Sequence, residues 1–278
     1  MITAVLALGG ALSWGVGDFL GGLATRRLAV ITVLAVSQAI GLAGLLVWVL
    51  AAGYAFPGIT QLLPAAAAGI AGLVGLGALY RGLAIGAMGI VAPISAASPI
   101  VPLAVDAAHG DTPAALQWLG IALVLTGIAV LSREPSGADN RRVATGAGLA
   151  VLAALGFGLF VVGLDAGADE SAAWAVVAAR AASVSVAVMA AVVTTTSLRP
   201  PRRLLPMLVG VGVFDTGANV LVAAATTHGA AGIVAVLSAL YPVITVVLAW
   251  LVLGERLGPS KRVGGVVALA GAAFVAAG

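Results

Sequence analysis

Three ionisable side chains lie well inside long apolar stretches of the sequence: Asp18, Arg180 and Asp215. A charge at the centre of a membrane helix costs about 2.5–3.5 kcal/mol on insertion scales and is tolerated beside a partner or water. Arg180 could hold a carboxylate through two parallel hydrogen bonds, and either aspartate could hold an ammonium group or carry a proton. These residues predict a site for a zwitterion such as an amino acid. A structural salt bridge between Arg180 and Asp215, and simple access of water to Asp18, are the alternatives.

Polar and aromatic side chains at helical spacing from these charges are further candidates for the substrate site. Asn219 follows Asp215 by one helical turn and shares its face. Trp14 precedes Asp18 by one turn and lies at mid-span, away from the interface where Trp usually anchors a helix. Packing would explain an aromatic side chain equally well. Two tyrosines are also candidates for the cavity lining: Tyr80 and Tyr241.

A proline-containing segment of thirteen residues occurs twice in the sequence. The segments 89–101 (GIVAPISAASPIV) and 232–244 (GIVAVLSALYPVI) are identical at seven of thirteen positions and lie 143 residues apart. Each carries a proline at the same place, Pro99 and Pro242, near the middle of an apolar stretch. A proline inside a helix removes one hydrogen bond from the carbonyl four residues back. We therefore expect either a pair of hinges or a pair of static kinks.

The residues four positions before these prolines are both serines, Ser95 and Ser238. Their freed carbonyls and their hydroxyls could face a central cavity, and the helices could flex there during transport. We therefore count Ser95 and Ser238 among the expected substrate-binding residues, with Pro99 and Pro242 as hinges.

The composition indicates which solvent surrounds these elements. The 278 residues are 62% hydrophobic and 8% charged, with a mean hydropathy of +1.19, whereas soluble domains carry about 25% charged residues. The chain is therefore expected to be an all-α integral membrane protein in a lipid bilayer. We find no nucleotide-binding loop or metal-ligand cluster and expect no cofactor, no metal and no catalytic residues. There is no cysteine.

A helix needs about 20 residues to cross the hydrocarbon, and apolar segments of that size predict ten transmembrane helices. The polar stretch 133–142 divides the chain into a first five-helix repeat at 1–132 and a second at 143–278, which form one integrated transport domain, with a cytoplasmic linker between them. The predicted spans are 2–24, 29–52, 62–84, 87–107, 113–132, 143–164, 171–196, 204–226, 230–252 and 259–277.

Basic residues are distributed very unevenly over the predicted loops. Twelve of the thirteen Lys and Arg residues fall on one side of the membrane. By the positive-inside rule that side is cytoplasmic, which leaves both termini outside. The net charge of +3 is thus assigned to membrane orientation rather than to nucleic-acid binding. Four tryptophans near span ends are expected to anchor at the interface: Trp48, Trp118, Trp174 and Trp250.

An odd number of helices per repeat forces the second copy to enter the membrane upside down, as in the inverted repeats of secondary transporters. Two shorter echoes support the repeat. ALSWG at 11–15 matches ALGFG at 154–158, and Gly110-Asp111 matches Gly254-Glu255. The acids of the second echo are expected to sit at helix starts, where the helix dipole favours negative charge.

Together these features resemble the drug/metabolite transporter superfamily, EamA type: ten helices in two repeats, Trp-Gly in helix 1, proline in helices 4 and 9, and Gly-Glu before helix 10. The resemblance implies a multi-pass transporter of a bacterial inner membrane, often an exporter of amino acids or other small metabolites, and not an enzyme.

We therefore expect a secondary active exporter of small polar or zwitterionic metabolites that works by alternating access, with protons as a possible coupling ion. Efflux of organic cations or drugs, coupled to protons at Asp18, is the alternative. A membrane enzyme is disfavoured because the acids outside the spans are scattered. The sequence specifies no oligomer.

Overall fold

The computed structural model describes residues 1–84, 94–131, 140–254 and 258–278, without the side chains at 80, 82–84 and 140–145. Regular structure in these ranges is helical throughout. Two of the apolar stretches are broken into shorter helices. The elements are α1 (Ile2–Thr25), α2 (Val30–Ala51), α3 (Ile59–Ala84), α5 (Ile100–His109), α6 (Ala115–Leu131), α7 (Asn140–Ala168), α8 (Ala172–Val193), the 3-10 turn η1 (Arg202–Leu204), α9 (Leu205–Thr226), α10 (Ala231–Ser238), α11 (Tyr241–Leu253) and α12 (Pro259–Ala277).

Lipid as solvent explains why the described segments are helices. Backbone amides in hydrocarbon must find partners within their own segment, and apolar side chains can face outward at no cost. Along α1, for example, Val5, Leu8 and Leu12 are exposed on the outer surface of the bundle. Eight described segments are long and apolar enough to span a membrane, and the apolar helices α5 and α6 are shorter. The predicted all-α, ten-helix class is confirmed.

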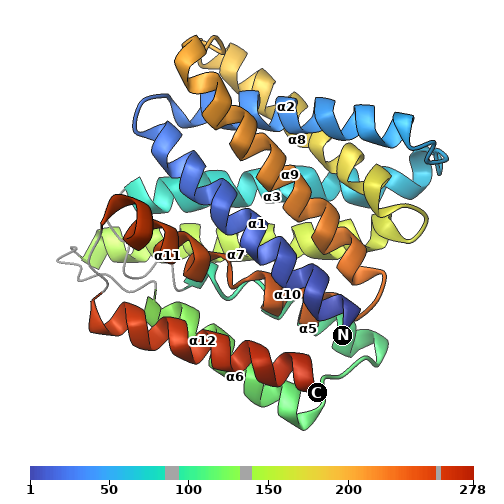
Figure 1. Cartoon of the computed structure of the whole chain (residues 1–278), viewed down its shortest axis with the longest axis vertical. Coiled ribbons are helices and arrows are strands. Elements are labelled where there is room, and N and C mark those ends of the chain that lie inside the picture. The colour runs from blue at the N-terminus through green and yellow to red at the C-terminus, as the bar shows by residue number, and fades with distance from the viewer. Residues whose placement is uncertain (85–93, 132–139, 255–257) are drawn as a thin grey trace.

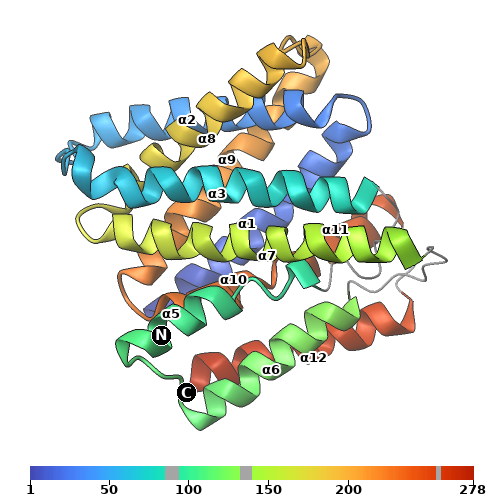
Figure 2. The same ribbon diagram turned by 180° about the vertical axis from the view of Figure 1, so that it is seen from behind.

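The helices pack as two equivalent sets. A shift of 143 residues carries α1, α2, α3 and α5 onto α7, α8, α9 and α11, and a shift of 144 carries α6 onto α12. The contacts respect this exchange: α3 packs on α7 as α1 packs on α9, while α2 packs on α8 and α6 on α12. Figures 1 and 2 show α1 and α9 on one face of the bundle and α3 and α7 on the other.

Glycine permits two of the closest approaches between the sets. A Cβ atom at Gly15 would lie 2.9 Å from the carbonyl oxygen of Tyr241, and one at Gly158 would lie 2.7 Å from that of Ser98. Both members of this pair of contacts are related by the same shift of 143 residues. The matched Trp-Gly and Phe-Gly motifs therefore seat α1 and α7 against the two proline-containing helices.

The second echo, Gly110-Asp111 with Gly254-Glu255, reflects helix ends rather than acid chemistry alone. Gly110 ends α5 with φ 96° and Gly254 ends α11 with φ 68°, a left-handed conformation in which glycine is the favoured residue. Glu255 lies outside the described residues.

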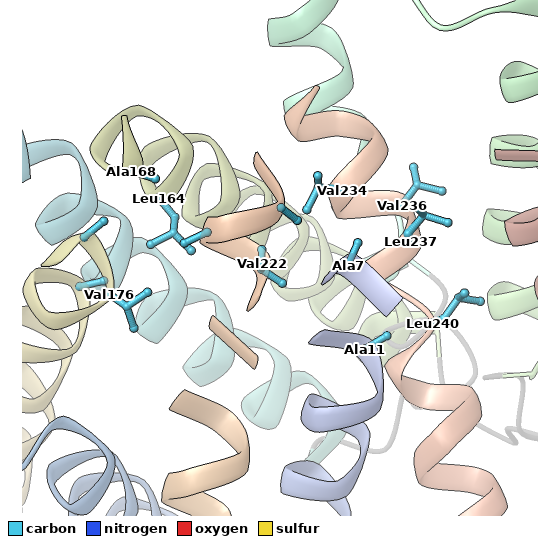
Figure 3. Close-up of a cluster of buried hydrophobic side chains, with 14 of the residues drawn as sticks. Ala7, Ala11, Leu164, Ala168, Val176, Val222, Val234, Val236, Leu237 and Leu240 are labelled. Carbon is cyan, nitrogen blue, oxygen red and sulfur yellow. The ribbon is translucent and has the colours of Figure 1, made fainter. Parts of the chain in front are cut away.

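The two ends of the bundle differ. We call the end where α1, α3 and α8 finish and where α9 and α12 begin the basic end, because the described basic residues other than Arg180 gather around it. Both termini lie near one another at the opposite end (Figures 1 and 2). Buried apolar side chains from α1, α7, α8, α9 and α10 gather in one core cluster (Figure 3).

One expected interface anchor belongs instead to this core. Trp174 is buried, its Nε1–H donates to the carbonyl of Tyr54 at 3.2 Å, and its ring meets Phe56 edge to face. Its indole therefore packs inside the bundle, whereas an interface anchor would face the lipid headgroups. Trp48, Trp118 and Trp250 are exposed, as anchors should be.

Candidate functional site

Both proline-containing segments are broken at matching points. Helix α10 ends at Ser238 and α11 begins at Tyr241, with Pro242 in its first turn. In the first repeat, Ser95 is helical, 96–99 is a turn, and α5 begins directly after Pro99. The prolines thus sit at the start of the second half-helix, where a missing N–H costs least. In the described residues, the helices are therefore interrupted at the positions where the sequence predicted hinges or kinks.

The prediction of a free backbone carbonyl at Ser95 is wrong. Its oxygen accepts a hydrogen bond from the amide of Ser98 at 3.2 Å, within the turn. Ser95 is buried and is not among the described residues that line the cavity. Its counterpart Ser238 does line the cavity, and its hydroxyl donates to the carbonyl of Ala7 at 3.5 Å. The turn re-satisfies the carbonyl of Ser95, so a freed carbonyl is not what the first break offers.

A cavity of about 420 Å³ lies between the two repeats, beside the breaks. Its lining continues to Gly22, Thr25 and Val30, at the junction of α1 and α2, so it extends to the basic end. Seven of the sequence-predicted residues lie on its wall: Trp14, Asp18, Arg180, Asp215, Asn219, Ser238 and Tyr241. The side chain of Tyr80, in α3, lies outside the described residues.

An ion pair crosses the wall between α8 and α9. Arg180 Nη2 lies 2.5 Å from Asp215 Oδ2, with the arginine side chain 7% exposed and the aspartate 30% exposed. Arg180 Nε and Nη2 make no hydrogen bond of good geometry within the described part of the chain. A buried donor without an acceptor costs about 1–3 kcal/mol. The guanidinium is therefore neutralised by Asp215 but keeps donor capacity for another group.

Asp18 presents a second carboxylate. It lies on α1, and its exposed side chain lines the cavity. Trp14, one turn earlier, meets Tyr241 edge to face with ring centroids 6.3 Å apart. The described wall thus combines two carboxylates and one guanidinium with the aromatic rings of Trp14 and Tyr241. Among the described residues, no three His, Cys, Asp or Glu side chains gather as a metal site would require.

Sequence reasoning did not select Gln38 and Ser183, which also lie on the wall. The Ser183 hydroxyl donates to Gln38 Oε1 at 2.8 Å, and both side chains are buried. Ser183 was detectable, since it follows Arg180 by one turn and shares its face. Gln38 was visible only as an uncharged residue near the repeat position of Arg180.

Packing identifies Gln38 as the structural counterpart of Arg180. Gly69 of α3 abuts the carbonyl of Ala179, and Gly212 of α9 abuts the carbonyl of Ser37. The residue after each carbonyl is Arg180 in one repeat and Gln38 in the other, and both reach the cavity. The two repeats therefore place one polar side chain each at this level.

Comparison with known proteins agrees with this architecture. The model of the EamA-like transporter family matches the chain twice, over residues 1–133 and 144–277. A solved crystal structure, described only as that of a protein, superposes with a TM-score of 0.81 at 18% identity, covering 99% of this chain and 98% of that one. No curated protein sequence matches the chain.

The structural likeness bears on the fold, and the family match bears on what the fold is for. The two matched segments together take in nearly the whole chain, and they coincide with the two equivalent sets of helices around the cavity. The chain belongs to the EamA-like transporter family, within the drug/metabolite transporter superfamily, and is a multi-pass membrane transporter.

Proposed function

We propose that this protein is a secondary active exporter of small zwitterionic metabolites such as amino acids, working by alternating access in a bacterial inner membrane. The observation that carries this proposal is the Arg180–Asp215 pair with spare donors on the guanidinium. A carboxylate bound to Arg180 would release Asp215, and Asp215 or Asp18 would then receive the ammonium group. A single cargo with both charges satisfies all three residues.

The cavity's shape supports alternating access. It extends to the basic end, while buried apolar side chains such as Leu164, Val222 and Val234 (Figure 3) separate it from a second, more polar hollow at the opposite end. If the basic end is cytoplasmic, as the positive-inside rule requires, this is the state that loads cargo from the cytoplasm. Both termini then lie outside. The inverted repeat supplies a second state in which the roles of the ends exchange.

A second candidate function, efflux of organic cations coupled to protons, rests on a different observation. The described wall carries one more carboxylate than guanidinium, and Asp18 has the rings of Trp14 and Tyr241 nearby. Aromatic faces and a carboxylate attract ammonium groups together. In this scheme the Arg180–Asp215 pair stays closed, and Asp18 alone exchanges cargo for a proton.

Thermal unfolding of the purified protein in detergent separates the two functions. The panel contains amino acids, small carboxylates, sugars, nucleosides and quaternary amines, because a ligand at 100 times its dissociation constant stabilises by about 2.7 kcal/mol. We expect zwitterions to raise the Tm of the wild type and of Asp18→Asn, but not of Arg180→Ala. Arg81→Ala is the matched control, since Arg81 is exposed and outside the described lining. Stabilisation by quaternary amines alone, lost in Asp18→Asn, would establish cation efflux instead.

The orientation has its own test, which the absence of native cysteine makes clean. We expect a cysteine at Asp169, in the loop after α7, to react with an impermeant maleimide in intact cells. A cysteine at Arg27, in the loop after α1, should react only after the membrane is opened. The reverse pattern would overturn the assignment of the basic end to the cytoplasm.

A further inference from the structure

Two repeat-equivalent parts of the cavity wall, here called its two halves, have opposite chemistry. One half is the packed pair α1 and α9, and the other is the packed pair α7 and α3. Figure 1 shows the first pair toward the viewer, and Figure 2, from behind, shows the second. Because the shift of 143 residues exchanges the pairs, each position on one half has a counterpart on the other.

The α1/α9 half carries the polar groups. Asp18 comes from α1, Asp215 and Asn219 come from α9, and Arg180 reaches Asp215 from α8, which packs on both α9 and α3. Charges on this half are thus held within one region of the wall.

The α7/α3 half carries apolar residues at the positions equivalent to the polar residues of α1 and α9. At a shift of 143, the counterpart of Asp18 is Val161, that of Asp215 is Gly72, and that of Asn219 is Leu76. All three line the cavity, together with Leu73 and Phe160 of the same half. The lining contributed by α3 and α7 contains no charged or polar side chain among the described residues.

From this division we propose that the cavity selects amphipathic cargo, with a charged head group on α1/α9 and an apolar tail on α7/α3. The substrate class is α-amino acids or similar zwitterions whose side chain is a sizeable hydrocarbon, and short or polar side chains are discriminated against. The inference rests on the proposed function for its head group, while the tail rests on the apolar half alone. A zwitterion without a side chain would leave that half in contact with water. Each methylene placed there is removed from water, which favours binding.

The test is an equilibrium competition series on the purified wild-type protein. Glycine, alanine, norvaline and norleucine share one head group and differ in the length of an unbranched tail. Each buried methylene contributes about fourfold in affinity, so norleucine should bind about 60-fold more tightly than alanine, which has three fewer methylenes. A parallel series of n-alkylamines tests the tail without the carboxylate.

Two variants and a control locate the tail. Leu76→Asn gives α3 the residue found at the equivalent position of α9, and Leu73→Ala shortens the apolar wall. We expect both to reduce the affinity for norleucine about fivefold to tenfold and to leave that for alanine unchanged. Leu63→Ala is the matched control on the same helix, because Leu63 is 55% exposed on the outer surface and should change neither.

The outcomes separate this inference from the proposed function. Amino acids that bind through Arg180 with equal affinity at every tail length would overturn the amphipathic division and keep the zwitterion site. Alkylamines that show the length dependence, while no amino acid binds, would uphold the apolar half and overturn the zwitterion site. A length dependence that persists unchanged in both Leu76→Asn and Leu73→Ala would place the tail elsewhere and overturn the inference.

Discussion

The two repeats of this transporter agree in where their backbones meet and differ in what they show to the cavity. Gly15 and Gly158 approach the broken helices in the same way, at carbonyls that correspond under the repeat. At the same level, Asp18 of the first repeat corresponds to Val161 of the second. The comparison teaches that the inverted repeat keeps a common framework, whereas the side chains that line the cavity diverged between the copies.

The helix pair α6 and α12 illustrates the framework alone. Gly120 lies against Gly271, and Gly127 lies against Gly264, so the same four glycines form a crossing that is symmetric under the exchange of repeats. Small residues let membrane helices pack through van der Waals contact, which replaces the hydrophobic drive that lipid removes. No residue of α6 or α12 is among the described lining of the cavity.

The largest effect is expected where the repeats agree. Gly15→Val and Gly158→Val should each abolish recovery of folded protein. At Gly15 even a Cβ atom would meet the Tyr241 carbonyl at 2.9 Å and the side chain of Ile244, and at Gly158 it would meet the Ser98 carbonyl. A backbone cannot yield as a flexible side chain can. The measurement is the yield of monodisperse protein after detergent extraction.

Gly44→Val is the control for that pair. It is also a mid-helix glycine, in α2, but a Cβ atom there meets nothing within 4 Å. We expect normal recovery. If only one of Gly15 and Gly158 tolerates valine, the framework is less symmetric than the contacts indicate.

The next largest effect sharpens the contrast at the ion pair. Asp215→Ala should destabilise the protein more than Arg180→Ala, because the two partners differ in exposure, 7% for the arginine and 30% for the aspartate. Removing Asp215 strands a buried cation at a cost of about 3–5 kcal/mol, whereas removing Arg180 leaves a carboxylate that the cavity can hydrate. Chemical denaturation of both variants and of the double variant measures the order. Equal losses would mean that both charges are equally shielded.

A third prediction concerns an acid present in one repeat only. Asp106 Oδ2 accepts a hydrogen bond from the Gly232 amide at 2.6 Å and so ties α5 to α10 at the end opposite the basic end. The repeat counterpart of Asp106 is Ala249. Asp106→Ala should speed hydrogen exchange at the start of α10, since a hydrogen bond to a charged group contributes about 1.5–3 kcal/mol. Asp111→Ala, exposed in the following loop, should leave that exchange unchanged.

The sequence predicted the fold well because lipid imposes a strong and local rule. Any segment that crosses must be a helix, so apolar length gives the spans, and the matched motifs give the repeat. Boundaries such as 2–24 against Ile2–Thr25 differ by only a residue. Trp174 was misplaced because its burial depends on Tyr54 and Phe56, from a loop far away in the sequence.

Cavity-lining residues were predictable where placing the side chain in a membrane span costs free energy. They were much less predictable where the side chain is typical of a membrane helix. Asp18, Arg180 and Asp215 stand out because a charge in a span demands a reason. Leu76 and Val161 are typical of any membrane helix, and only the packing of the helices reveals that they line the same cavity as Asp215 and Asp18. Ser95 was assigned by symmetry with Ser238, but the turn that follows it occupies its carbonyl.

The smallest effect is expected at the hydrogen-bonded pair of Ser183 and Gln38. Ser183→Ala removes the hydroxyl that donates to Gln38 Oε1 at 2.8 Å and leaves a buried carbonyl oxygen without that donor. One such hydrogen bond contributes about 1 kcal/mol, which corresponds to about fivefold in binding if the bond holds Gln38 in place for cargo. Ser185→Ala is the matched control, since Ser185 lies on the same helix, is exposed, and bonds only to the Ala181 carbonyl within it. Isothermal titration with the best ligand of the amino-acid series measures both variants. If they bind equally well, Gln38 is a packing residue, and the asymmetry between Gln38 and Arg180 places the whole polar contribution of this level on the second repeat.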